Sequence, residues 1–243
     1  MEHGQIRIKV EQVSKSFGHS EVLHQINLHI PASQIFGLLG PSGSGKTTLV
    51  KIISGIDEAS SGEVFVLDHK MPVLSMLGKI GYMSQSDALY QELTAYENLD
   101  FFASLYGIRS KQRKNRIKEV MELVNLSEDL HKQVSNYSGG MKRRLSLAAA
   151  LLHDPKILIL DEPTVGIDPL LRQSIWQEFS RLSKDGTTIL VTTHVMDEAE
   201  KCDQLGMIRN GSLIAVGTPE QLKAETDSST LEEAFLHYGR ETL

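Results

Sequence analysis

The chain of 243 residues holds 25 Lys and Arg against 31 Asp and Glu, a formal net charge of −6, and 40% of its residues are hydrophobic. This length and composition predict a globular protein with one large domain, or a domain plus a subdomain, around a sizeable core. No apolar stretch approaches the roughly 18 residues of a membrane span, and the acidic balance argues against a dedicated nucleic-acid-binding protein.

The first residues lack the apolar core of a signal peptide, and the single cysteine, Cys202, leaves no disulfide possible within the chain. Both features fit a reducing cytoplasm. We expect Cys202 to be a buried thiol near a helix end.

Strands open the chain. Alternating polarity predicts two half-buried antiparallel strands, Ile6–Val13 and Val22–Ile30, and the apolar run Gln34–Leu39 predicts a buried strand. A helix is predicted over Thr48–Ile53.

Between that buried strand and that helix lies Gly-Pro-Ser-Gly-Ser-Gly-Lys-Thr, with the spacing G-x-x-x-x-G-K-[ST] of a phosphate-binding P-loop. Its glycines let backbone N–H groups and the positive helix N-terminus face one anion. Lys46 can reach the β- and γ-phosphates, and the hydroxyl of Thr47 can take one position on Mg²⁺. We therefore predict a nucleoside triphosphate site formed by Gly40, Pro41, Ser42, Gly43, Ser44, Gly45, Lys46, Thr47 and Thr48.

Two further short strands are predicted at Glu63–Leu67 and Lys79–Met83, and then the pattern becomes helical. From about Asp87 to Val134 apolar residues recur at helical spacing, which predicts a helical subdomain inserted into an α/β core. Its basic stretch, Arg109–Lys118, is interpreted as the solvated face of a helix. A weaker alternative is that this stretch lies near lipid headgroups.

An acidic pair follows the next predicted strand. Ile157–Leu160 is apolar throughout, as expected at the centre of a parallel sheet, and it ends in Asp161 and Glu162. Ligands bind at the carboxyl ends of such strands. We expect Asp161 to hold Mg²⁺ beside the P-loop and Glu162 to orient and polarise an attacking water molecule.

The remaining elements are predicted as a helix near Leu170–Ser183, a strand at Thr187–Thr193, strands near Gln204–Arg209 and Leu213–Val216, and a helical tail from Pro219 to Tyr238. The expected organisation is a single domain over 1–243. Within it, 1–86 and 154–218 form the β subdomain and core, 87–153 the helical subdomain, and 219–243 the tail.

The segment Tyr137-Ser-Gly-Gly-Met-Lys-Arg-Arg-Leu145 resembles the signature motif of ATP-binding-cassette (ABC) transporters, and with the P-loop and acidic strand the resemblance covers nearly the whole chain. Ser138, Gly139 and Gly140 open a predicted helix, whose N-terminus offers a second anion site. Tyr137 and Met141 stand where the family most often has Leu and Gln, but the hydroxyl and the glycine amides are retained.

The resemblance also implies roles for four other residues. Phe17 matches the aromatic residue that stacks on adenine, and Gln85 matches the glutamine that touches Mg²⁺ and water. Asp168 matches the loop that crosses the dimer interface. His194 matches the switch histidine that contacts the γ-phosphate and the catalytic glutamate.

The fold implied is an α/β P-loop NTPase (RecA-like) core with an antiparallel β subdomain and the inserted helical subdomain. The function implied is ATP hydrolysis with Mg²⁺ by Lys46, Gln85, Glu162 and His194. Each ATP would lie between one subunit's P-loop and the signature motif of a second copy or of a paralogous ATPase subunit. The resemblance further implies a membrane permease on a separate chain, a place on the cytoplasmic face of the membrane, and no nucleic-acid partner.

The direction of transport is inferred from resemblances that are less specific than those of the ATPase motifs. The signature segment, Val165–Asp168 and the ending after Gly217 are similar to drug- and antibiotic-exporter ATPases of the daunorubicin-resistance type. An importer ATPase, which shares the motor, remains an alternative. A soluble ABC ATPase is a further alternative, although the coiled-coil insertions or paired cassettes that mark such proteins are not present in the sequence.

Overall fold

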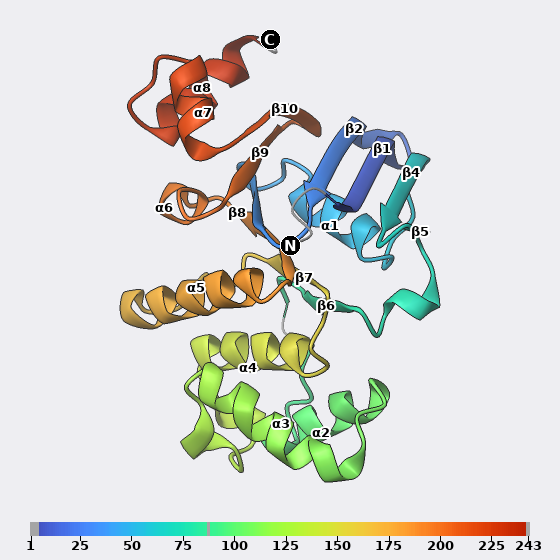
Figure 1. Ribbon diagram of the computed structural model, residues 1–243, viewed down its shortest axis with the longest axis vertical. Coiled ribbons are helices and arrows are strands. Elements are labelled where there is room, and N and C mark those ends of the chain that lie inside the picture. Colours follow the sequence, from blue (N-terminus) through green and yellow to red (C-terminus); the bar gives the residue numbers. More distant parts are fainter. Residues whose placement is uncertain (1–4, 87, 242–243) are drawn as a thin grey trace.

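The computed structural model describes residues 5–86 and 88–241, which form two sheets and their covering helices (Figure 1). The smaller sheet is antiparallel, with strand order β2-β1-β4-β5. Its strands are β1 (Ile6–Phe17), β2 (Ser20–Pro31), β4 (Ser61–Val66) and β5 (His69–Lys70). The predicted boundary at residue 87, and the predicted ends at residues 1 and 243, lie outside the described residues.

The larger sheet has the order β10-β9-β3-β8-β7-β6, in which only the edge strand β10 is paired antiparallel. Its strands are β3 (Ile35–Leu39), β6 (Ile80–Met83), β7 (Ile157–Asp161), β8 (Thr188–Thr193), β9 (Gln204–Arg209) and β10 (Ser212–Gly217). Every residue of β3, β7 and β8 is buried, because helices or the second sheet cover both faces.

Successive residues of β7 face two separate cores. Ile157 and Ile159 pack with α1 (Lys46–Ile53) and the antiparallel sheet, whereas Leu158 and Leu160 pack with the helices on the opposite face. This alternation follows from the period of two in a strand. It explains why the sequence of β7 is continuously apolar.

The helices that cover the face of the larger sheet opposite α1 lie one above another in Figure 1. Helix α5 packs against β3 and β8 of the larger sheet, whereas α4 packs against β6 of the same sheet and contacts α2 and α3. Their bounds are α2 (Ala95–Leu105), α3 (Ser110–Leu123), α4 (Gly139–Leu151) and α5 (Pro169–Lys184). The short helix α6 (Met196–Ala199) follows β8, and α7 (Pro219–Glu225) and α8 (Leu231–Glu241) form the tail at the opposite end. Three 3₁₀ segments complete the described elements: η1 (Leu74–Met76), η2 (Ser127–Asp129) and η3 (Val134–Asn136).

Side-chain caps fix where several helices begin. Thr94 and Glu97 form a reciprocal capping box at the start of α2, and Thr218 and Gln221 form one at α7. Asp168 caps α5, whose first residue is proline. Two of these helices begin close to the predicted starts near Leu170 and at Pro219, whereas the start of α2 at Ala95 was not predicted.

The predicted fold class is confirmed, and the main difference lies in the first hairpin. Strands β1 and β2 extend beyond the predicted Ile6–Val13 and Val22–Ile30, because pairing continues through register shifts after Val10. Such bulges break the alternation of polarity without ending the strand. Neither β5 nor η1 was predicted.

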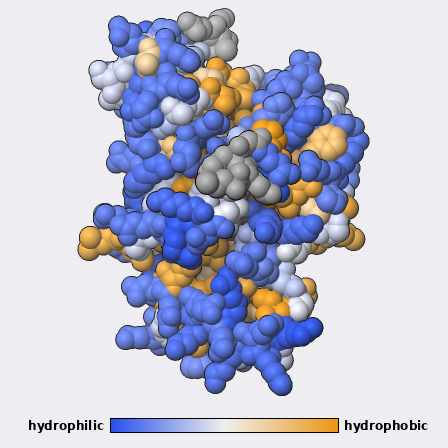
Figure 2. Space-filling model, viewed as in Figure 1, coloured by the Kyte–Doolittle hydropathy of each residue, from blue (hydrophilic) through white to orange (hydrophobic). Residues whose placement is uncertain are grey.

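Cys202 is buried after the end of α6, as expected, and burial raises the pKa of its thiol, with the charges of Asp203 and Glu198 adding to the effect. Hydrophilic residues cover most of the face shown in Figure 2, where apolar residues emerge in small groups. None of the helices in the described part of the chain combines the length and hydropathy of a membrane span.

We expect Gly81→Ala to destabilise the fold, because a β-carbon at Gly81 in β6 would lie 2.2 Å from the carbonyl oxygen of Ala150 in α4. Forcing these elements apart should lower the free energy of unfolding by about 1–3 kcal/mol, measured by urea denaturation. The matched control is Gly78→Ala, where no atom lies within 4 Å of the added carbon. The control should change stability by less than about 0.5 kcal/mol, and equal losses in both variants would contradict the role given to close packing.

Candidate nucleotide site

A pocket of about 270 Å³ lies where the loop after β3 enters α1. It therefore opens at the carboxyl ends of the parallel strands, where such sheets bind ligands. Its lining consists of Val22, Ser42, Gly43, Gly45, Lys46, Thr47, Thr48, Gln85 and Glu162.

The backbone of the P-loop requires its glycines. Gly43 and Gly45 adopt φ values of 79° and 105°, a region that side-chain-bearing residues rarely occupy. Gly40 has no room for a side chain, since a β-carbon there would lie 2.3 Å from the carbonyl oxygen of Ile208 in β9. The loop can thus wrap closely around an anion at the start of α1.

The ammonium group of Lys46 is folded back onto this loop. Its Nζ donates to the carbonyl oxygens of Gly40 at 2.7 Å and Pro41 at 2.9 Å. Burial lowers the pKa of Lys46, and the carboxylates of Glu162 and Asp161 act in the opposite direction. An anionic ligand in the pocket would counteract this effect of burial on the pKa, because a nearby negative charge favours the protonated ammonium.

Asp161, the last residue of β7, is fully buried. The hydroxyl of Thr192 in β8 donates to its Oδ1, whereas none of the described residues donates to its buried Oδ2. A buried carboxylate oxygen without a donor is the acceptor that a hard divalent cation takes, together with hydroxyl, amide and water oxygens. The donor types of Asp161, Thr47 and Gln85 fit Mg²⁺.

Glu162 meets the side chains of Gln85 and His194. The Nε2 of Gln85 donates to Glu162 Oε2 at 3.1 Å, and the Nδ1 of His194 lies 2.9 Å from Glu162 Oε1. The backbone N–H of Glu162 donates to the hydroxyl of Thr192 at 3.0 Å. Three predicted catalytic residues, from the ends of β6, β7 and β8, are thereby brought together beside the P-loop.

Phe17 ends β1 and leaves 53% of its surface exposed, so it does not belong to the core. The Nζ of Lys15 lies 4.9 Å from the centre of its ring. The ring is therefore available for contact with a flat ligand.

Ser138, Gly139 and Gly140 do not line the pocket of their own chain. The hydroxyl of Ser138 accepts from the N–H of Met141 and caps α4. A β-carbon at Gly140 would lie 3.2 Å from the carbonyl oxygen of Gly166, so the start of α4 adjoins the loop that leads to Asp168. The two segments predicted to meet a second subunit are thus neighbours.

Two buried residues at the site were not singled out from the sequence. Arg143 in α4 donates to backbone carbonyls of both Gln85 and Glu162. Glu198 accepts from the hydroxyls of Thr164 and Thr193, which lie close to Glu162 and His194 in the chain. Arg143 lies within the signature segment Tyr137–Leu145, but no role was assigned to it from the sequence.

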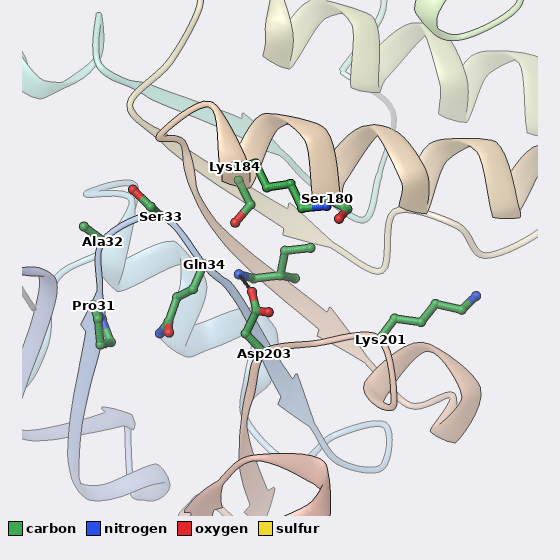
Figure 3. A pocket seen from close by; sticks show the side chains of 10 residues that line it. Pro31, Ala32, Ser33, Gln34, Ser180, Lys184, Lys201 and Asp203 are labelled. Atoms are coloured by element: carbon green, nitrogen blue, oxygen red, sulfur yellow. Dashed lines mark hydrogen bonds between the residues drawn. The ribbon is translucent and has the colours of Figure 1, made fainter. Parts of the chain in front are cut away.

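A larger cavity of about 420 Å³ lies elsewhere, between the start of β3 and α5 (Figure 3). Gln34 lines it, whereas the P-loop follows Leu39 at the other end of the same strand. It contains none of the predicted site residues, so volume alone does not locate the nucleotide site.

Comparison with known proteins tests the family assignment. The family model described as "ABC transporter" matches residues 23–165, which include the P-loop, the signature segment and the acidic strand. The chain belongs to the ABC transporter family. It is the ATP-binding cassette of that family, as predicted.

Two curated relatives have names that describe a multidrug transporter component and a resistance protein. The chain is 39% identical over 240 residues to the probable multidrug ABC transporter ATP-binding protein YbhF of Escherichia coli, an alignment that covers 96% of this chain and 42% of YbhF. The cassette thus spans about two fifths of that relative's length. It is also 39% identical to the linearmycin resistance ATP-binding protein LnrL of Bacillus subtilis, over 94% of this chain and 77% of LnrL.

A solved structure shares the architecture. The dimeric post-hydrolysis structure of the ATP-binding cassette MJ0796, bound to ADP and Pi, superimposes with a TM-score of 0.81 and 27% identity. The match covers 87% of this cassette and 98% of that chain.

We expect Thr192→Val to destabilise the cassette, because it removes the donor to buried Asp161 and one acceptor for the N–H of Glu162. The N–H of Glu162 keeps the carbonyl oxygen of residue 192 as an acceptor, but Asp161 Oδ1 loses its donor. This loss should lower the free energy of unfolding by about 1–3 kcal/mol in urea denaturation. The control is Thr187→Val, at the half-buried residue immediately before β8, which should lower the free energy of unfolding by less than about 0.5 kcal/mol. A Thr192→Val variant as stable as the control would contradict the importance of this hydroxyl.

Proposed function

We propose that this cassette hydrolyses ATP with Mg²⁺ and, as a dimer on a separate membrane permease, powers export. The observation that carries the proposal is the meeting of Gln85 and His194 on the carboxylate of Glu162, beside the P-loop.

Within each site the residues divide the work. Lys46 and the P-loop amides neutralise phosphate charge, and Asp161, Thr47 and Gln85 supply the ligands for Mg²⁺. The cation would offset charge on the phosphates during phosphoryl transfer. Glu162 accepts a hydrogen bond from the attacking water and aligns it with the γ-phosphate.

His194 and Gln85 hold the Glu162 carboxylate by opposite oxygens, which restricts its rotation. His194 would then also reach the γ-phosphate. The exposed ring of Phe17 suits stacking on adenine, a contact worth about 1–3 kcal/mol per base.

The dimer supplies the other half of each site. Because Ser138–Gly140 do not line their own chain's pocket, the anion site at the start of α4 is available to the nucleotide of a second subunit. The loop that contains Asp168 would cross the dimer interface, and the apolar side chains of Val165 and Leu170, which flank Asp168 in the sequence, are exposed. The dimeric structure of MJ0796 supports this arrangement. The second subunit is another copy or a paralogous ATPase.

An apolar pocket of about 270 Å³ supports a membrane partner. It lies between the end of β6 and helices α2 and α4, and its lining includes Ile56, Leu89, Phe102 and Tyr106. It also includes Ser84, the neighbour of Gln85, so a permease segment seated there would adjoin the catalytic residues. This partner would hold the cassette at the cytoplasmic face of the membrane, with no role for nucleic acid.

The names of the relatives favour export over import. YbhF is described as a probable multidrug transporter component and LnrL as a linearmycin resistance protein, which points to amphipathic or antibiotic-like cargo. An importer ATPase is the second candidate, because the same motor serves both directions, and a soluble ABC ATPase is the third.

Glu162→Gln tests the chemistry. The variant keeps the size of the side chain but loses its charge, so ATP turnover should fall by about 10²–10⁴-fold while ATP binding survives. Light scattering should detect a dimer that persists in ATP. Lys46→Ala is the comparison, because it should weaken nucleotide binding itself in a titration. Near-wild-type hydrolysis by Glu162→Gln would refute the assignment.

A composite site predicts that specific activity rises steeply with protein concentration, since two chains build each site. Ser138→Arg should leave ATP binding to the single chain almost unchanged and block ATP-driven dimerisation, because its side chain would enter the interface. Turnover should be measured down to concentrations at which sedimentation shows monomers. A flat specific activity over that range would exclude the composite site.

A further inference from the structure

Arg143 lies buried in α4, with 7% of its surface exposed, at the point where β6 and β7 end. One end of its guanidinium donates to the carbonyl oxygens of Ser84 at 2.7 Å and Gln85 at 2.9 Å. The other end donates to the carbonyl oxygens of Asp161 and Glu162, the latter at 2.7 Å. One side chain thus joins two segments that are far apart in sequence.

The two segments carry the two side chains that meet in the site. The side-chain amide of Gln85 donates to the carboxylate of Glu162, and Arg143 donates to the backbone carbonyl oxygen of each of these two residues. A planar guanidinium can serve both backbones at once because its N–H groups diverge in a fixed fork.

Arg143 also holds the backbone conformation of Glu162. Glu162 has a φ of 52°, a left-handed conformation that is uncommon for a residue with a side chain. Arg143 binds the carbonyl oxygens of the peptide groups on both sides of the Glu162 α-carbon. The N–H of the first of these peptides donates to Thr192. Such a conformation persists where surrounding contacts over-determine it.

We propose that Arg143 is a positioning residue for hydrolysis, which keeps Glu162 aimed at the attacking water and in contact with Gln85. The assignment rests on the proposed function, because it concerns the same carboxylate. It adds a link from that carboxylate to α4, the helix whose start, Ser138–Gly140, would face the partner's nucleotide.

The test compares Arg143→Lys with Arg116→Lys in the purified full chain. Lysine keeps the charge but cannot reach four carbonyl oxygens as a fork. Arg116 is the matched control: it donates to the carbonyl oxygens of Leu151 and Leu152 at the far end of α4, away from the pocket. Measurements are the melting temperature, ATP affinity of the single chain, and kcat and KM for ATP.

Arg143→Lys should lower kcat by about 10- to 100-fold, because a displacement of about 1 Å in a reacting group can cost this much, with KM and ATP affinity within about twofold of wild type. Arg116→Lys should retain wild-type kcat. A parallel loss of ATP affinity and melting temperature in Arg143→Lys would indicate a structural role only and would overturn the proposal, as would an unchanged kcat.

A double-variant cycle separates this inference from the proposed function. If Arg143 acts through Glu162, adding Arg143→Lys to Glu162→Gln should not lower the residual turnover further. A second, multiplicative loss would overturn the proposal even if Glu162 is catalytic. Wild-type turnover and the effect of Glu162→Gln alone test the proposed function, independently of Arg143.

Discussion

Parallel pairing of β3, β8, β7 and β6 determines which residues meet in this cassette. Parallel strands end at the same edge of a sheet, so the P-loop after β3, His194 after β8, Asp161 and Glu162 at β7, and Gln85 after β6 converge. Since both faces of the strands are covered, these polar residues can only project from the edge. If any of these pairings slipped by one residue, a polar side chain of the site would point into one of the two hydrophobic cores.

Charge at this edge is balanced over short distances. The carboxylates of Asp161 and Glu162 act on the cation of Lys46, and Arg143 donates to the backbone carbonyl oxygens of the same two acidic residues. The hydroxyl of Thr192 donates to Asp161 Oδ1 and accepts from the N–H of Glu162. Buried charges persist when they are paired or hydrogen-bonded. The arrangement leaves Asp161 Oδ2 as a buried acceptor that a ligand can satisfy.

The sequence predicted those parts of the cassette that depend on local signals. The P-loop and the apolar strand before Asp161 each lie within a few residues, and the fold class and family are confirmed. Arg143 escaped prediction because its partners Ser84 and Glu162 lie 59 and 19 positions away, so only the folded chain reveals the contact. The lengths of β1 and β2 were underestimated for another reason, since bulges interrupt their polarity pattern. The roles of individual site residues stay predictions.

The burial of Cys202 has a practical consequence for following the cassette in motion. A thiol that is shielded from water and has a raised pKa provides little thiolate, the form that reacts with maleimides and nitroxide reagents. Because the chain has no other cysteine, a cysteine introduced on an exposed position of α3 or α5 would be the one residue that takes the label. Spin-label or fluorescence distances between two such chains could then follow the approach and separation of subunits without prior removal of the native thiol.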